Sequence, residues 1–185
     1  MKKILIASLL LAALPASAND PLLDDARKVA SALPPKLLAV LAAEMENGGP
    51  EGAISVCRDK APQLAKAASE ESGWAVRRVS LKNRNPKAVP DAWERAVLEE
   101  FDRRAAAGEA PAKIEKGEVV TDGGQKTYRY MKALPTMQPC TSCHGDPSAM
   151  KPAVREKLAN LYPQDLAVGY KVGDIRGAIT LKKAL

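Results

Sequence analysis

The feature that most constrains this chain is the pentapeptide Cys140-Thr141-Ser142-Cys143-His144. Two thiols three positions apart, followed by a histidine, are what covalent attachment of a haem requires. The thiols add across the two vinyl groups of the porphyrin, and the imidazole binds the iron as an axial ligand. His144 is also the single histidine of the 185-residue chain. The pentapeptide therefore predicts one haem c, bound through Cys140 and Cys143, with His144 on the iron.

Three other roles for the cysteines explain the pattern less well. A Cys3His zinc site would add Cys57 to the motif, but adjacent residues such as Cys143 and His144 cannot easily occupy two corners of one tetrahedron. A thioredoxin-like redox pair opens a helix directly after a buried strand, whereas residues 133–139 read as an extended loop. A structural disulfide gives the adjacent histidine no role. Haem attachment is the interpretation that uses all three side chains.

Residues 1–18 have the pattern of a cleavable signal peptide. Residues 1–3 are basic, 4–14 are apolar, and 16–18 form a small-x-small cleavage site. The apolar run is shorter than the roughly 20 residues that span a bilayer. Loss of its two lysines lowers the formal charge from +6 to +4. Because haem c is attached outside the cytoplasm, we expect a periplasmic protein without stable membrane insertion, whose working domain is 19–185.

The expected helices lie mostly in the first half of the chain. Apolar spacing predicts a helix over 21–46 that is interrupted at Pro34-Pro35 and ends at 47–50, then a second helix over 51–72. In the second helix Cys57 belongs to an apolar stripe, so its side chain should point inward. Pro62 should kink this helix or open a new turn. Further helices are expected over 92–107, with a capping-box start, and over 152–161.

Short β-rich segments alternate with these helices. They fall at 74–81, 113–116, 118–121, 125–131, 167–170 and 177–181, with a hairpin-type turn at 122–124. Along the chain, helices come first, then strands on either side of a central helix, and then further strands. This order predicts one α+β domain with a small antiparallel sheet. The chain has only one Phe, two Trp and four Tyr, so a haem would add a large apolar surface to an otherwise aliphatic core.

The second axial ligand of the iron is left open by the residues. A second histidine is excluded within one chain, and the candidates are Cys57, Met131 or Met137, a lysine, or no ligand. Cys57 is the odd cysteine once the motif is assigned, and a free thiol in an oxidising compartment invites damage unless something occupies it. A thiolate ligand would stabilise ferric iron and lower the reduction potential. The alternative role for Cys57 is that of a small buried apolar residue.

Five further residues are weaker candidates for contacts with the haem. Arg84, Arg129 and Arg176 could pair with its propionates, because guanidinium groups bind carboxylates well. Each could equally be a surface charge or organise a loop. Tyr128 and Tyr130 alternate on a predicted strand, so one of them could face the porphyrin or both could serve ordinary sheet packing.

The chain resembles a family of single-haem c-type proteins with a PAS-like fold, a domain of unknown function that is related to haem sensor domains of histidine kinases. The resemblance covers nearly all of 20–185. It rests on the segments 53–57, 80–86, 90–94, 128–130, 161–163 and 169–178, together with the CxxCHG motif. It implies a PAS-like antiparallel sheet with flanking N-terminal helices, and histidine/cysteine ligation by His144 and Cys57. Ala88 differs from the family pattern, because the resemblance leads us to expect a polar asparagine at this position of the loop.

Two functions follow from the haem, and several others are disfavoured. In the first, the protein senses redox state or a diatomic gas such as NO or CO, and passes the signal to a partner protein. The alternative is low-potential electron transfer with a periplasmic redox partner, towards which a charge of +4 would steer only weakly. An enzyme such as a peroxidase needs a distal acid or base that a one-histidine chain supplies poorly. Nucleic-acid binding has no basis in the sequence, which carries no basic-aromatic patch.

Overall fold

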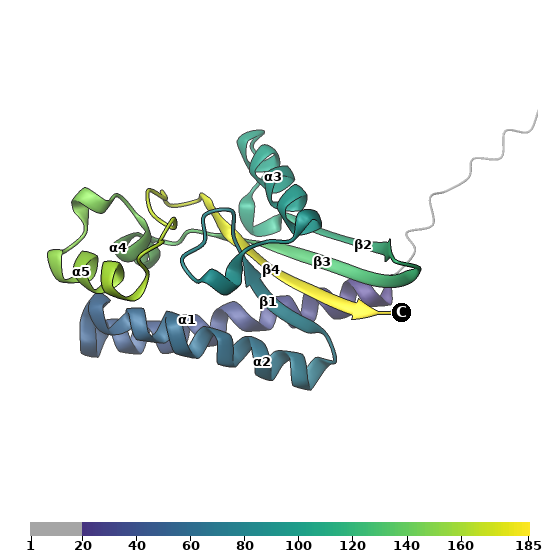
Figure 1. The fold of residues 1–185 in the computed structure, drawn as a ribbon, viewed down its shortest axis with the longest axis horizontal. Coiled ribbons are helices and arrows are strands. Elements are labelled where there is room, and N and C mark those ends of the chain that lie inside the picture. The colour runs from purple at the N-terminus through teal and green to yellow at the C-terminus, as the bar shows by residue number, and fades with distance from the viewer. Residues whose placement is uncertain (1–19) are drawn as a thin grey trace, which may run out of the picture.

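The computed structural model describes residues 20–185, and the predicted signal peptide lies outside them. The chain forms an α+β fold in which a long N-terminal helix and its successor run beside a four-stranded sheet (Figure 1). The helices are α1 (Pro21–Ser55), α2 (Ala61–Ser72), α3 (Ala92–Ala106), α4 (Thr141–His144) and α5 (Pro152–Leu161), and the strands are β1 (Ala75–Val79), β2 (Glu115–Asp122), β3 (Gln125–Pro135) and β4 (Ile175–Ala184). Within 20–185, no helix combines the length and apolar character needed to cross a membrane.

The sheet is antiparallel throughout, in the order β1-β4-β3-β2. Side chains alternate between its two faces, as the period of two in a strand requires. On β3, Tyr128 and Tyr130 belong to the core beneath α1, and Met131 belongs to the core beneath α3. The β2–β3 hairpin turns at Gly123 and Gly124, which have φ values of 56° and 83°. Two consecutive residues with positive φ form the kind of turn that fits the twist of a hairpin.

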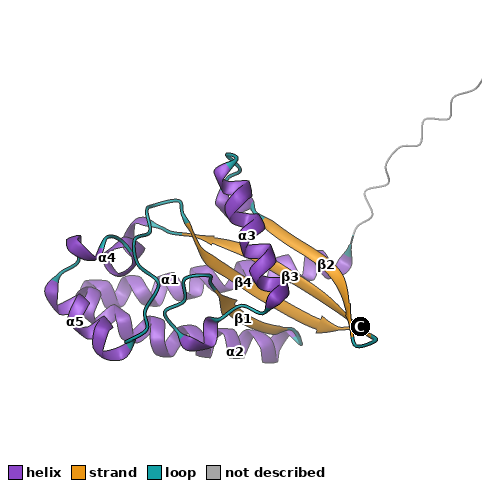
Figure 2. Cartoon of the chain, turned by 45° about the horizontal axis from the view of Figure 1, so that its top comes forward, coloured by secondary structure: helices purple, strands orange, loops and turns teal. Residues whose placement is uncertain are grey.

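Three apolar clusters hold the elements together. Figure 2 shows the arrangement of the elements that they join, with α3 over one face of the sheet and α1 over the other. The first fills the space between the sheet and the α1–α2 pair, and its largest buried side chain is Trp74. The second lies between the sheet and α3, around Phe101. The third joins α1 to α5 through Ile54 and Leu158, and Cys143 packs against it. The haem-attachment motif therefore lies beside the third cluster.

Helix α3 begins with the predicted capping box. Asp91 accepts a hydrogen bond from the Glu94 N–H (2.9 Å), and Glu94 accepts one from the Asp91 N–H (2.8 Å). Glu94 is fully buried, and it also accepts a hydrogen bond from Thr180 and pairs with Arg77 and Arg129. The first turn of α3 is thus fixed to both β4 and β3.

The predicted interruption at Pro34-Pro35 is wrong, because α1 continues through both prolines. A proline ring fixes φ near the helical value, so the pair removes backbone hydrogen bonds without forcing the chain out of the helix. Ala26 and Ala30 are fully buried before the pair, and Leu33 packs against the same core directly beside it. The helix does break at Gly49, which has φ 63° and ψ −169°, within the predicted end at 47–50.

Six strand segments were predicted, and the sheet has four strands. Segments 113–116 and 118–121 belong to the single strand β2, and both β3 and β4 are longer than predicted. Residues 167–170 form no strand. Their backbone N–H groups bond to the haem-attachment motif instead of to a neighbouring strand, from Gly169 to Gly145 O (2.8 Å) and from Tyr170 to His144 O (2.9 Å).

Candidate functional site

The haem-attachment motif lies on one helical turn after the end of β3. A 3₁₀ turn over Gln138–Cys140 leads directly into α4. Because residues three apart on a helix share a face, Cys140 and Cys143 present their thiols on the same side. Both side chains are partly exposed, whereas His144 is only 8% exposed. The arrangement places two accessible thiols beside one buried imidazole.

His144 is oriented by a backbone carbonyl. Its Nδ1–H donates a hydrogen bond to Ala167 O at 2.7 Å, because a carbonyl oxygen can only accept. The other ring nitrogen, Nε2, is then unprotonated and available to a metal. This is the usual arrangement of a metal-binding histidine. Burial, followed by the positive charges of Arg176 and Arg84, holds the pKa of His144 far below its ordinary value, so the ring is neutral.

Arg84 ties the motif to the segment that supports His144. Its guanidinium pairs with Asp165 at 2.8 Å and donates hydrogen bonds to Cys143 O (2.6 Å) and Ala167 O (3.3 Å). The Arg84 and Asp165 side chains are 11% and 12% exposed. Arg84 therefore organises the loops around His144 through its Nε and Nη2 atoms, and its role as a propionate partner stays a prediction.

Gly145 closes the turn that carries the motif. Its N–H bonds to Thr141 O at 2.9 Å. A Cβ atom added at Gly145 would lie 2.6 Å from the same carbonyl oxygen, closer than such atoms approach in folded proteins. The backbone of α4 therefore has room only for a glycine after the histidine.

Cys57 does not point inward as predicted. It lies in η1 (Val56–Lys60), a turn of π-helix, and is exposed, whereas Val56 before it is buried. Pro62 lacks the N–H that would bond to the carbonyl four residues before it, and the N–H of Ala61 reaches back five residues to Val56 O. This wider turn breaks the 3.6-residue period on which the prediction relied. Pro62 does open the new helix, as predicted.

Cys57 nevertheless lies at the same end of the molecule as the motif. The pKa of Cys143 is raised by burial, lowered by Arg84, and raised again by the charge of Cys57. The backbone brings the two segments together, because Cys143 Sγ lies 3.9 Å from Pro50 O near the end of α1. Across residues 20–185, no three His, Cys, Asp or Glu side chains gather as a site for a metal ion held by side chains alone.

The other candidates for the second axial position occupy different places. Met131 is fully buried under α3 beside Leu98 and Phe101. Met137 is 45% exposed just before the 3₁₀ turn that begins the motif. The identity of the second ligand stays a prediction, with Cys57 and Met137 at the surface and Met131 in the core.

Three of the weaker candidates serve the sheet and its covering helices. Tyr128 donates a hydrogen bond to Asp20 (2.6 Å), and Tyr130 donates one to Glu115 (2.7 Å), so both hydroxyl groups are used beneath α1. Arg129 pairs with Asp91 at 2.6 Å, and its guanidinium lies 4.3 Å from the ring centroid of Trp93. The structure thus places Tyr128, Tyr130 and Arg129 in the two sheet cores and not beside His144.

Arg176 lies next to His144, and a second arginine, Arg78, lies near it, which the sequence did not indicate. Arg176 Nη1 is 3.5 Å from His144 Nδ1. Burial, followed by the positive charge of Arg78, lowers the pKa of Arg176 to about 9. Arg77 and Arg78 are consecutive in β1, so they point to opposite faces of the sheet. That alternation was the available signal that one of them faces inward.

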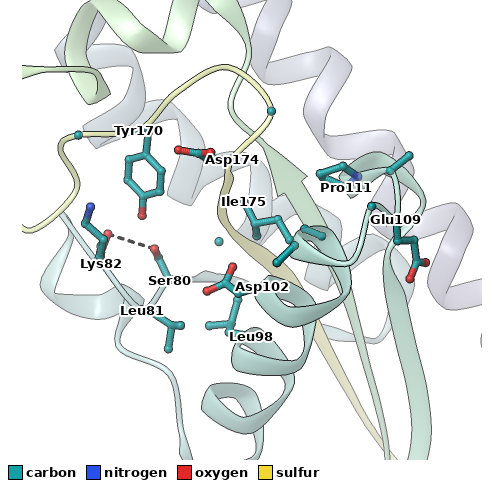
Figure 3. A pocket seen from close by; sticks show the side chains of 17 residues that line it. Ser80, Leu81, Lys82, Leu98, Asp102, Glu109, Pro111, Tyr170, Asp174 and Ile175 are labelled. Atoms are coloured by element: carbon teal, nitrogen blue, oxygen red, sulfur yellow. Dashed lines mark hydrogen bonds between the residues drawn. The ribbon is translucent and has the colours of Figure 1, made fainter.

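A separate cleft of about 650 Å³ lies behind this site (Figure 3). It runs between α3 and the segment 169–177, and Figure 3 shows Tyr170 and Asp102 reaching into it from opposite sides. The ring of Tyr170 meets that of His144 edge to face, with centroids 6.4 Å apart. The cleft thus adjoins the motif through Tyr170, but neither cysteine of the motif lines it.

Comparisons with known proteins give one family and one solved structure. The sequence profile of the Tll0287-like family matches residues 16–183. The crystal structure of the cyanobacterial heme-protein Tll0287 is similar to this chain, with a TM-score of 0.55 and 28% sequence identity, over 70% of this chain and 71% of that chain. A comparison with curated proteins found no match.

Proposed function

The chain belongs to the Tll0287-like family, and we propose that it is an exported c-type cytochrome with one covalently bound haem. Its family membership confirms the resemblance to haem proteins that the sequence motifs indicated. The observation that carries the proposal is the geometry of the motif. Two thiols lie one helical turn apart beside a buried imidazole whose Nδ1–H is held by Ala167 O at 2.7 Å, which leaves Nε2 for iron.

Attachment uses the two cysteines of the motif. Cys140 and Cys143 each add an S–H bond across a vinyl group, so that a sulfur–carbon bond forms and the proton moves to the terminal vinyl carbon. No electron is gained or lost in this addition. His144 supplies the first axial ligand, and the loops that Arg84 joins hold its ring in place. When bound, the haem supplies an iron that changes between the ferric and ferrous states.

We assign the second axial position to Cys57 and the function to sensing of redox state or of a gas such as NO or CO. A thiolate prefers ferric iron, so reduction would weaken its bond and free one axial position. Cys57 stands in a π-helical turn between α1 and α2, and such turns are frequent at functional sites. Its release would act directly on the packing of two helices. The family resemblance supports a PAS-like description of the sheet, a periplasmic location and a signalling partner.

Low-potential electron transfer is the alternative function. Both attachment cysteines are partly exposed, so an edge of a haem held by them would lie near the surface, within reach of a redox partner. The two functions differ in one testable property, because a sensor must open an axial position and an electron carrier keeps both ligands. Peroxidase-type catalysis is not proposed.

The attachment is tested by maturing the protein with the haem-attachment machinery in a bacterial periplasm and denaturing it. We expect the denatured wild-type chain to retain haem, measured as an added mass of one haem on the intact chain. The Cys140→Ser/Cys143→Ser double variant should lose it, whereas the matched control Cys57→Ala should keep it. A wild-type chain that carries no haem after denaturation would overturn the proposal.

A further inference from the structure

Two arginines near His144 have no acidic partner among residues 20–185. Three other arginines that are not exposed each pair with a carboxylate, and these are Arg84 with Asp165, Arg104 with Glu109, and Arg129 with Asp91. Arg78 and Arg176 are likewise only partly exposed. The described ion pairs contain neither of them, and the single side-chain contact of either is the one between Arg176 Nη1 and His144.

That one contact does not satisfy Arg176. The Nδ1 atom of His144 already carries the hydrogen that it donates to Ala167 O, so it cannot accept another from Arg176. Arg78 and Arg176 also repel each other, because each carries a positive charge. Partly buried cations of this kind are normally paired. Two such groups side by side call for an anion with more than one carboxylate or an equivalent charge.

Arg176 contacts one predicted iron ligand, His144, and the strand position of Arg78 relates it to the helices that flank the other, Cys57. Arg78 shares the face of β1 that Val76 presents to α1 and α2, the helices that flank Cys57. Burial lowers the pKa of Arg78, and the charges of Cys57, Cys140 and Tyr170 act in the opposite direction. Arg176 thus lies against His144, and Arg78 lies on the face of the sheet that α1 and α2 cover, the two helices joined by the Cys57 turn.

We infer that Arg78 and Arg176 together bind the two propionate carboxylates of the haem. The inference rests on the proposed function, and it adds Arg78, which the sequence did not indicate. Guanidinium groups match carboxylates with paired, parallel hydrogen bonds, which makes arginine better suited to this role than lysine. The haem would then be held at three places, by its thioether bonds, by its axial ligands and by its propionates.

The test is the reduction potential of the matured protein in the variants Arg78→Gln, Arg176→Gln and the double variant. Loss of each positive charge should shift the equilibrium between ferric and ferrous iron about tenfold towards ferric iron, which is a potential about 59 mV lower. The control is Arg95→Gln, because Arg95 is exposed on α3. Ferric spectra should match the wild type, since no axial ligand is changed.

Three results would overturn the inference. One is a pair of variants whose potentials equal that of Arg95→Gln while haem remains attached. Another is a ferric spectrum that changes to that of Cys57→Ala, which would mean that the arginines support the thiolate and not the propionates. The third is an Arg78→Lys variant whose reduction potential falls as far as that of Arg78→Gln, because lysine keeps the positive charge and should keep the potential nearer to the wild-type value. Arg78→Lys also replaces Arg78→Gln in the test if the glutamine variant does not fold. Absence of haem from the wild type would instead reject the proposed function.

Discussion

Glu94 shows how much of this fold depends on one buried carboxylate. It caps α3, pairs with Arg129 at 3.3 Å and accepts a hydrogen bond from Thr180 at 3.0 Å. Replacing Glu94 would remove the carboxylate that Arg77 contacts and would leave Arg129 with Asp91 alone, and disrupting a buried ion pair is strongly destabilising. We therefore expect Glu94→Gln to lower the free energy of unfolding by about 3 kcal/mol, measured by urea denaturation. The exposed and unpaired Glu99→Gln is the control, and an equal effect of both substitutions would contradict this role.

Glu115 makes the stability of the first core depend on pH. Burial raises the pKa of Glu115, but hydrogen bonds from Arg27 and Tyr130 outweigh it, so the pKa lies below its ordinary value of 4.5. A carboxyl group with a lowered pKa stabilises the fold above its unfolded pKa, and this stability is lost as the pH falls through the folded value. Below about pH 4.5 the wild type should lose stability more steeply than Glu115→Gln. The measurement is the urea midpoint of each protein from pH 6 to pH 3. An equal fall of the midpoint with pH in the wild type and in Glu115→Gln would contradict this prediction.

Single residues were predictable where their chemistry depends on local spacing. Five consecutive residues suffice to predict roles for Cys140, Cys143 and His144, and the structure places them on one helical turn. The inward direction of Cys57 could not, because it depends on a change of helix type that no residue count reveals. Arg78 was missed for a different reason. A free cation is recognised only when the partners of the other arginines are known, and those partners are distant in the sequence.

The element that carries the motif tolerates little change. Helix α4 has only four residues, and its last turn is closed by the bond from Gly145 N–H to Thr141 O. Gly145→Ala would place a Cβ atom 2.6 Å from that oxygen and displace either the turn or the segment 165–170. We expect less covalently bound haem per chain, measured by absorbance against protein mass. The control Ser142→Ala lies in the same helix and should keep the wild-type amount, and equal yields for both would argue against this constraint.

The sequence predicted the ends of several helices more accurately than it predicted whether a helix or strand continues through its interior. The capping box at Asp91 and the end of the second helix at residue 72 were both predicted correctly, because each depends on a few neighbouring residues. The prolines of α1 misled the prediction, because the φ of proline is close to the helical value and the helix continues despite the lost hydrogen bonds. The segment 167–170 misled the prediction for another reason. Its backbone N–H groups bond to the predicted haem-attachment motif and not to a neighbouring strand.

At the scale of the whole molecule, the sheet and the haem motif occupy different ends. The sheet has its own two cores, and the motif lies with α4 and α5 at the end where α1 meets η1 (Figure 1). The α+β class and the single sheet were predictable from the order of the segments. How the far end of α1 meets the motif was not, because the contact between Pro50 and Cys143 joins residues 93 positions apart.

The central claim is that iron is held between His144 and Cys57, and an optical series on the matured protein tests it most directly. Spectra would be recorded for the ferric protein, the ferrous protein and the ferrous protein under carbon monoxide, for the wild type and for Cys57→Ala. We predict a low-spin ferric spectrum with thiolate character, a ferrous form that takes up carbon monoxide, and a changed spin state in Cys57→Ala. A methionine-type band without carbon monoxide binding, or identical spectra for the two proteins, would contradict the claim.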